Sequence, residues 1–171
     1  MEIHEYEKFW LAASLLLIVG IIATVTYGAV GVGVSMIDDK GGTIDPKAVD
    51  QHPKFGNPGV YKTGANEYDV YVVAKQFVYQ PGTNEPIVVP ANSTLTFHVT
   101  SADVIHGFEV VGTNANTMVI PGQIATFTVE VSGPREYGIL CNEYCGAGHH
   151  GMEGTLKVVP EDEFNATAGG A

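Results

Sequence analysis

The stretch TLTFHVT, residues 94–100, alternates between apolar and polar side chains. A period of two is that of a β-strand with one buried face, so we predict that Leu95, Phe97 and Val99 face a core. His98 belongs to the opposite set, and we expect it to be an exposed strand residue. The stretch therefore predicts a half-buried strand.

Short runs of the same kind recur along the chain from residue 68 to residue 159. They are rich in β-branched and aromatic residues and are separated by Pro, Gly and other turn residues: YDVYVVA, EPIVVP, GFEVVG, TMVI, ATFTVEV, REYGIL and GTLKVV. Many short strands at regular spacing are typical of an all-β sandwich or barrel and disfavour a parallel α/β sheet. The sequence therefore predicts an all-β domain.

The N-terminal part has a different character, because residues 9–37 contain no Asp, Glu, Lys or Arg. About 20 such residues suffice to cross the hydrocarbon core of a membrane as a helix. A cleaved signal peptide normally has an apolar region of about 7 to 15 residues and a small-residue cleavage site, and this run is longer and lacks an A-x-A pattern. We predict one transmembrane helix in contact with membrane lipid. The few lysines near it do not decide its orientation.

These patterns divide the chain into four segments. Residues 1–37 form the transmembrane anchor, and residues 38–67, rich in Gly, Pro, Asn and Asp without periodicity, are expected to be an extended connector. The β domain covers residues 68–160, and the small, polar tail at residues 161–171 is expected to be disordered.

The chain is acidic, with 19 Asp and Glu against 8 Lys and Arg and a formal net charge of −11. Such a charge repels nucleic acid, so we expect no nucleic-acid partner, and it steers cationic partners toward the protein. Solubility or a high-salt habitat would account for the same charge without any partner.

One loop collects soft ligands: CNEYCGAGHHGM, residues 141–152, holds both cysteines of the chain. A further histidine lies upstream in ADVIHGFEV, at the edge of a predicted strand. Together the two segments offer two thiols, two imidazoles and one thioether, from His106, Cys141, Cys145, His149 and Met152. Copper is the metal that such a mixture of thiolate, thioether and imidazole favours.

The number of copper ions depends on the role of the first cysteine. With only Cys145 as a ligand, the set has the composition of a mononuclear blue-copper site, which leaves Cys141 unexplained. Two thiolates on one loop can instead bridge two copper ions, each completed by one imidazole and one weak donor. Either centre is suited to electron transfer rather than to binding a substrate.

Two other interpretations use fewer of these residues. A disulfide between Cys141 and Cys145 is allowed outside the cytoplasm, but it ignores both histidines and Met152. Zinc accepts two cysteines and two histidines, but it gives the methionine no role. Copper is therefore the interpretation that we prefer.

The motifs DVIHGFEV and CNEYCGAGHHGM together resemble the CuA domain of subunit II of haem-copper cytochrome c oxidases. The likeness extends from the N-terminal helix to about residue 159, and the single helix is most similar to the B-type, or ba-type, oxidases with one membrane anchor. The resemblance implies an all-β, cupredoxin-like Greek-key barrel or sandwich, preceded by one transmembrane helix and carrying a binuclear copper centre.

By position, the resemblance implies that two copper ions are held by the side chains of His106, Cys141, Cys145, His149 and Met152 and by the backbone carbonyl of Glu143. In many family members a glutamate at the position of Glu143 also contacts a magnesium ion, whose other ligands would lie outside this chain. The family spacing favours His149 over His150, for which we expect a surface position. Phe77 and Tyr79 lie where the family has an aromatic patch, and we leave both outside the predicted site.

The function that the resemblance implies is that of the subunit through which electrons enter a terminal oxidase. A soluble donor, either cytochrome c or a small blue-copper protein, would pass an electron to the copper pair and on to a haem in subunit I, where oxygen is reduced to water. The chain would then belong to an oxidoreductase and translocase complex whose oxygen-reduction site lies in another subunit. The implied location is the prokaryotic plasma membrane, with the copper domain on the outer side.

The main alternative is a membrane-anchored mononuclear blue-copper electron carrier, against which Cys141 argues. Oxidase subunits fed by quinol lack the copper ligands. Nitrous oxide reductase joins the same motif to a large propeller domain, for which 171 residues leave no room. A copper-delivery protein should expose exchangeable Met or Cys, whereas this set is a closed group for two metals.

Overall fold

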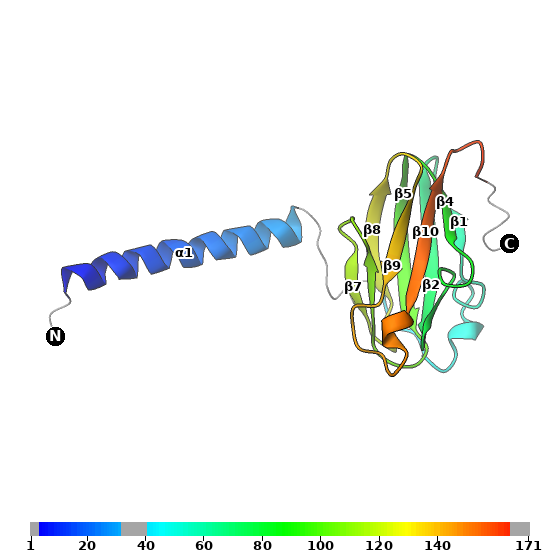
Figure 1. Cartoon of the computed structure of the whole chain (residues 1–171), viewed down its shortest axis with the longest axis horizontal. Coiled ribbons are helices and arrows are strands. Elements are labelled where there is room, and N and C mark those ends of the chain that lie inside the picture. The colour runs from blue at the N-terminus through cyan, green and yellow to red at the C-terminus, as the bar shows by residue number, and fades with distance from the viewer. Residues whose placement is uncertain (1–3, 32–40, 165–171) are drawn as a thin grey trace. The chain divides into compact units, whose positions relative to one another are not determined.

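The computed structural model describes residues 4–31 and 41–164 of the chain. It contains two compact units, an N-terminal helix and a β-sandwich, which are described separately (Figure 1). Residues 32–37 of the predicted anchor and residues 165–171 of the predicted tail lie outside the described residues.

Helix α1, Glu5–Val30, confirms the predicted N-terminal apolar helix. It begins at a capping box, in which the side chain of His4 accepts from the backbone N–H of Tyr6 and the Glu7 carboxylate accepts from the N–H of His4 at 2.9 Å. Its 26 residues extend about 39 Å, more than the roughly 30 Å of a bilayer's hydrocarbon core. None of its residues is buried, and its length and composition suit a membrane span.

The sandwich consists of two five-stranded sheets. The first sheet has the order β1 (Val60–Lys62), β2 (Glu67–Lys75), β5 (Ser93–Ser101) and β8 (Ala125–Val131), with β3 (Val78–Gln80) also paired to β2. The second has the order β4 (Ile87–Pro90), β10 (Glu153–Val159), β9 (Arg135–Leu140), β6 (His106–Val110) and β7 (Asn116–Val119). The pairs β2–β5 and β4–β10 are parallel, and the other pairs are antiparallel. The predicted all-β, cupredoxin-like architecture is confirmed.

The core lies between the inner faces of the two sheets. Leu95, Phe97 and Val99 of β5 are fully buried, as the alternation predicts. The ring of Phe97 packs against Phe108 of the other sheet with 5.6 Å between ring centroids. Because β6 and β9 form the opposite wall of this core, the ends of these strands are held in fixed positions relative to the first sheet.

His98 is not the exposed residue that the sequence predicts. It lies on the outer face of β5, where its ring stacks on Tyr71 of β2 with 4.6 Å between centroids, and its side chain is only 20% exposed. The alternation correctly assigned the face, but it contains no information about which groups cover that face.

The outer face of the first sheet is covered by part of the predicted connector. Val49, in the short 3₁₀ helix η1 (Val49–Gln51), and Phe55 are buried against Val73 of β2 and Ile124, the residue before β8. The same segment continues into β1, which pairs with β2. At the other end of the chain, the ring of Phe164 contacts Tyr68 with 5.5 Å between centroids. These contacts join both flanking segments to the sandwich.

Candidate metal centre

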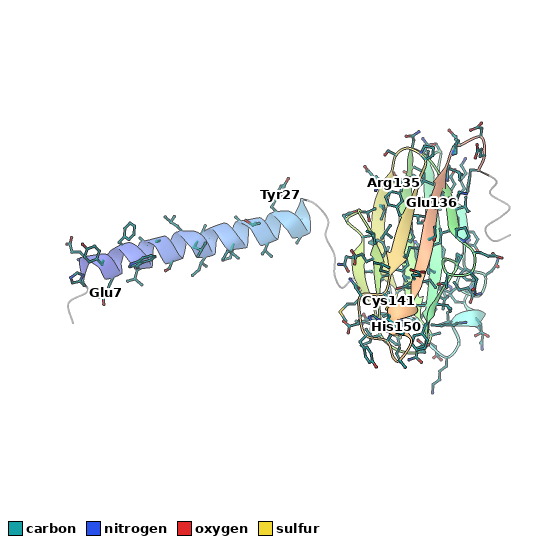
Figure 2. All side chains as sticks on the ribbon, viewed as in Figure 1. Glu7, Tyr27, Arg135, Glu136, Cys141 and His150 are labelled. Carbon is teal, nitrogen blue, oxygen red and sulfur yellow. The ribbon has the colours of Figure 1, made fainter. Side chains whose placement is uncertain are left out.

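The candidate site lies at one end of the sandwich, where the loop between β9 and β10 meets the first residue of β6. Figure 2 shows Cys141 and His150 toward this end, whereas Arg135 and Glu136, at the start of β9, lie toward the other end. The strand therefore leads the chain from one end of the domain to the other and delivers the loop at the point where β6 begins.

The two cysteines form the centre of the cluster, with 3.8 Å between their sulfur atoms. The Sγ of Cys141 lies 3.9 Å from Nδ1 of His106 and 3.2 Å from the backbone oxygen of Glu143. The Sγ of Cys145 lies 3.7 Å from Nδ1 of His149 and 3.6 Å from Sδ of Met152. Each sulfur thus has its own imidazole and its own additional donor, and the two halves meet at the sulfur pair.

The cluster is largely shielded from water. His106 is fully buried, and Cys141, Cys145 and Met152 are at most 8% exposed. The ligand atoms of His106 and the two cysteines lie within 4.8 Å of one another, so one ion can contact all three. His149 and Glu143 are half-buried and form the side of the cluster closest to solvent.

The structure distinguishes between the two adjacent histidines. Both belong to the 3₁₀ helix η2, His149–Gly151, in which successive side chains point about 120° apart. His149 is directed toward Cys145, and His150 is exposed, which is the surface position expected for it. The register that places the first histidine in the cluster therefore agrees with the geometry.

Asp103 orients the imidazole of His106. Its Oδ1 lies 2.8 Å from Nε2 of His106, and its carboxylate also accepts the backbone N–H groups of Gln76 and Val104, at 2.7 and 2.6 Å. Partial burial alone would raise the pKa of Asp103, but these hydrogen bonds lower it below its usual range, so the carboxylate is ionised and accepts only. This contact places a proton of His106 on Nε2 and leaves Nδ1 as the ring nitrogen that faces Cys141 and could bind a metal.

The hairpin between β2 and β3 packs against the loop that carries the two cysteines. The φ of Gly146 is +130°, and a Cβ on this residue would lie 2.6 Å from Nε2 of Gln76. A Cβ on Gly148 would lie 2.6 Å from the ring of Phe77. The two glycines thus let the loop pack directly on the hairpin, and Phe77 acts here as a packing surface beneath the loop.

Tyr79 belongs to the core rather than to the surface. It is 1% exposed, and its hydroxyl donates to the backbone oxygen of Gly107, next to His106, at 2.5 Å. Burial, and then the nearby Cys141 thiol, raise the pKa of Tyr79 well above its usual value, so its hydroxyl stays protonated.

The Cys145 thiol is protonated in the absence of a metal. Burial, followed by the hydrogen bond and the charge of Cys141, raises the pKa of Cys145 to about 11. Thiolates are the form that binds metals, so a metal that binds here displaces a proton from Cys145. The donor set of two thiolates, two imidazoles, one thioether and one carbonyl fits soft copper ions, and it leaves no ligand atom of the predicted set outside the cluster.

Asp103 and Gln76 were not predicted from the sequence as part of the site. Asp103 lies three residues before His106, a spacing at which a carboxylate in a turn can reach the ring, and this was the signal available. Gln76 lies far from the motif in the sequence and carried no comparable signal, because only the tertiary structure brings it to Cys145.

Comparisons with known proteins agree on one family. The sequence model of the family described as "Cytochrome C oxidase subunit II, periplasmic domain" matches residues 60–159. A "Cytochrome c oxidase subunit 2" of Thermus thermophilus is 44% identical over 159 residues, which cover 91% of this chain and 93% of that protein. A "Probable cytochrome c oxidase subunit 2" of Rickettsia prowazekii is 35% identical over 79 residues, which cover 46% of this chain and 25% of that protein.

Solved structures show the same fold. A chain of a haem-copper terminal oxidase dimer, determined by cryo-electron microscopy, superimposes with a TM-score of 0.72 and 27% identity, covering 91% of this chain and all of that one. The periplasmic domain of subunit II of cytochrome oxidase from Bradyrhizobium japonicum superimposes with a TM-score of 0.53 and 24% identity, covering 56% of this chain and 86% of that domain.

Proposed function

Because the chain belongs to the cytochrome c oxidase subunit II family, the subunits through which electrons enter haem-copper oxidases, we propose that its ligand cluster holds a binuclear copper centre. It is accordingly a part of an oxidoreductase complex. The two copper ions would take up one electron at a time from a soluble donor and pass it to a haem of subunit I. Oxygen reduction takes place in that other subunit.

One observation carries the assignment of two copper ions rather than one. The sulfurs of Cys141 and Cys145 are 3.8 Å apart, and each has a different imidazole within 4 Å. A mononuclear centre would use one cysteine with both histidines, and it would leave the other sulfur unused in the middle of the cluster. The observed division into two halves supports two metal positions that share the sulfur pair.

The chain's own residues contribute positioning and exclusion of water. Asp103 fixes the ring of His106, and the loop glycines allow the ligand loop to pack on the hairpin. The buried sulfurs and Met152 keep solvent from the ligand atoms, which reduces the rearrangement of polar surroundings when charge is gained or lost. These are the requirements of an electron-transfer site.

The assignment is tested on the full-length chain in detergent, loaded with copper, by metal analysis and electron paramagnetic resonance. An unpaired electron shared equally by two copper nuclei should give about seven hyperfine lines, and one confined to a single copper about four. Two coppers per chain with seven lines support the binuclear centre. One copper with four lines would refute it in favour of a mononuclear carrier.

The domain lies on the outer side of the membrane to which helix α1 anchors the chain. We place it in the plasma membrane of a prokaryote, as the single anchor and the similarity to B-type oxidases suggest, with a haem-bearing subunit I as its partner. The donor is cytochrome c or a small blue-copper protein, and the net charge of −11 favours a cationic one. Copurification of a haem-containing subunit with the tagged full-length chain tests the partnership.

The Glu143 side chain is the candidate magnesium ligand of this chain. The Glu143 carboxylate accepts from the backbone N–H of Tyr144 at 3.2 Å, and among the described residues it joins no cluster of three potential ligands. A magnesium ion there would take its other ligands from subunit I. Metal analysis of the isolated chain, without subunit I, should therefore find no stoichiometric magnesium, whereas the assembled complex should contain it.

A further inference from the structure

A single residue of the β2–β3 turn contacts both halves of the ligand cluster. The backbone N–H of Gln76 donates to Oδ2 of Asp103 at 2.7 Å, and the other oxygen of that carboxylate holds Nε2 of His106 at 2.8 Å. The side-chain amide of the same glutamine donates to the backbone oxygen of Cys145. One turn is thus hydrogen-bonded toward both His106 and Cys145.

The contact with the loop is close, although Gln76 as a whole is exposed. Its Nε2 occupies the space that a Cβ at Gly146 would enter, and the ring of the next residue, Phe77, fills the space below Gly148. The pairing of β2 with β3 runs from Val73 to Gln80 and does not require a glutamine side chain at the turn. The hydrogen bond to the Cys145 carbonyl is therefore an interaction of the side chain with the ligand loop.

We propose that Gln76 is a positioning residue, which sets the position of Cys145 relative to His106 by joining the ligand loop to the Asp103–His106 pair. The proposal rests on the copper centre proposed above, because Cys145 and His106 lie in opposite halves of that centre. Strand β6 pairs with β9, which leads into the ligand loop, but Cys145 lies beyond the end of β9, so its position relative to His106 also depends on contacts of the loop itself. The Gln76 turn, hydrogen-bonded to Asp103 and to the backbone oxygen of Cys145, supplies one such contact.

Gln76→Leu is the informative substitution, because it keeps the size of the side chain and removes the amide, while the backbone N–H to Asp103 remains. A net hydrogen-bond contribution of the usual size corresponds to a change of about fivefold. We expect the full-length, copper-loaded variant to keep two coppers and to lose them to an excess chelator about fivefold faster than the wild type. Because Cys145 would shift in this variant, the copper hyperfine splitting and the midpoint potential of the centre should also change.

Gln80→Leu is the matched control. Gln80 is also exposed and lies at the end of β3 in the same hairpin, and its side chain makes no hydrogen bond with any described residue. It should match the wild type in every measurement. If Gln76→Leu does not fold, Gln76→Asn keeps a polar turn but is too short for the amide to reach Cys145, and it should show the same changes.

A second measurement tests the connection itself. Asp103→Asn weakens the hold on His106, and if both contacts act through one turn, the double variant with Gln76→Leu should lose copper more slowly than the product of the two single factors predicts. A purely multiplicative result would mean two unrelated contacts and would overturn the proposal. So would a Gln76→Leu variant with the wild-type spectrum, potential and rate. A wild-type chain that binds fewer than two coppers would instead refute the proposed function.

Discussion

Replacing Asp103 by alanine removes the group that holds His106 in the orientation required by the cluster. The carboxylate accepts three N–H groups at 2.6 to 2.8 Å, from His106, Gln76 and Val104. Water can replace it at the two backbone groups, because Gln76 and Val104 are exposed. Nε2 of His106 is less accessible to water, since that side chain is fully buried in the intact protein.

The expected cost follows from these differences in exposure. A buried donor without an acceptor costs about 1 to 3 kcal/mol, and the two solvent-accessible hydrogen bonds add roughly 1 kcal/mol together. We therefore expect Asp103→Ala to lower the free energy of unfolding of the metal-free chain by about 3 kcal/mol. For a domain of this size this corresponds to a decrease of roughly 10 °C in the thermal midpoint.

Thermal unfolding of the metal-free, full-length chain in detergent measures this effect, with Asp162→Ala as a control at an exposed aspartate near the end of the described chain. Nitrogen-15 resonance of His106 adds a local observation, because the ring in the wild type should carry its proton on Nε2 and lose this preference in the variant. A variant within about 0.5 kcal/mol of the wild type, with an unchanged ring tautomer, would refute the reasoning.

Further predictions concern the ligands themselves. Cys141→Ser should abolish the two-copper centre, and a variant with two coppers and the wild-type resonance spectrum would show that this sulfur does not bridge. Met152→Leu should keep two coppers and raise the midpoint potential, measured by redox titration, because a thioether donor to the oxidised metal is lost. His150→Ala should leave the copper content unchanged, and loss of a copper would overturn the choice of His149. Because the pKa of Cys145 is raised to about 11, copper loading at pH 7 should release the Cys145 proton, which a pH indicator detects. The apparent affinity of the chain for copper should therefore fall as the pH is lowered.

Much of the architecture follows from local sequence patterns. The alternation in β5 identified its buried face, and the uncharged N-terminal run identified the helix, because periodicity and hydropathy depend on neighbouring residues alone. The motif with Cys141 and Cys145 gave the chemistry of the site, since soft ligands at this spacing have few other uses. Its chemistry did not depend on knowing the fold.

The contacts between segments were determined only by the tertiary structure. His98 stacks on Tyr71 and is not in the exposed position expected for it. Val49 and Phe55 of the predicted connector pack on the outer face of the first sheet. The tertiary structure also brought Gln76 to Cys145, across 69 positions of the chain. The sequence by itself predicted the candidate ligands and the strands, because both depend on short-range patterns. Asp103 lies only three residues from His106, but Gln76 reaches Cys145 from a distant segment, so only the packing of the hairpin against the ligand loop determined that contact.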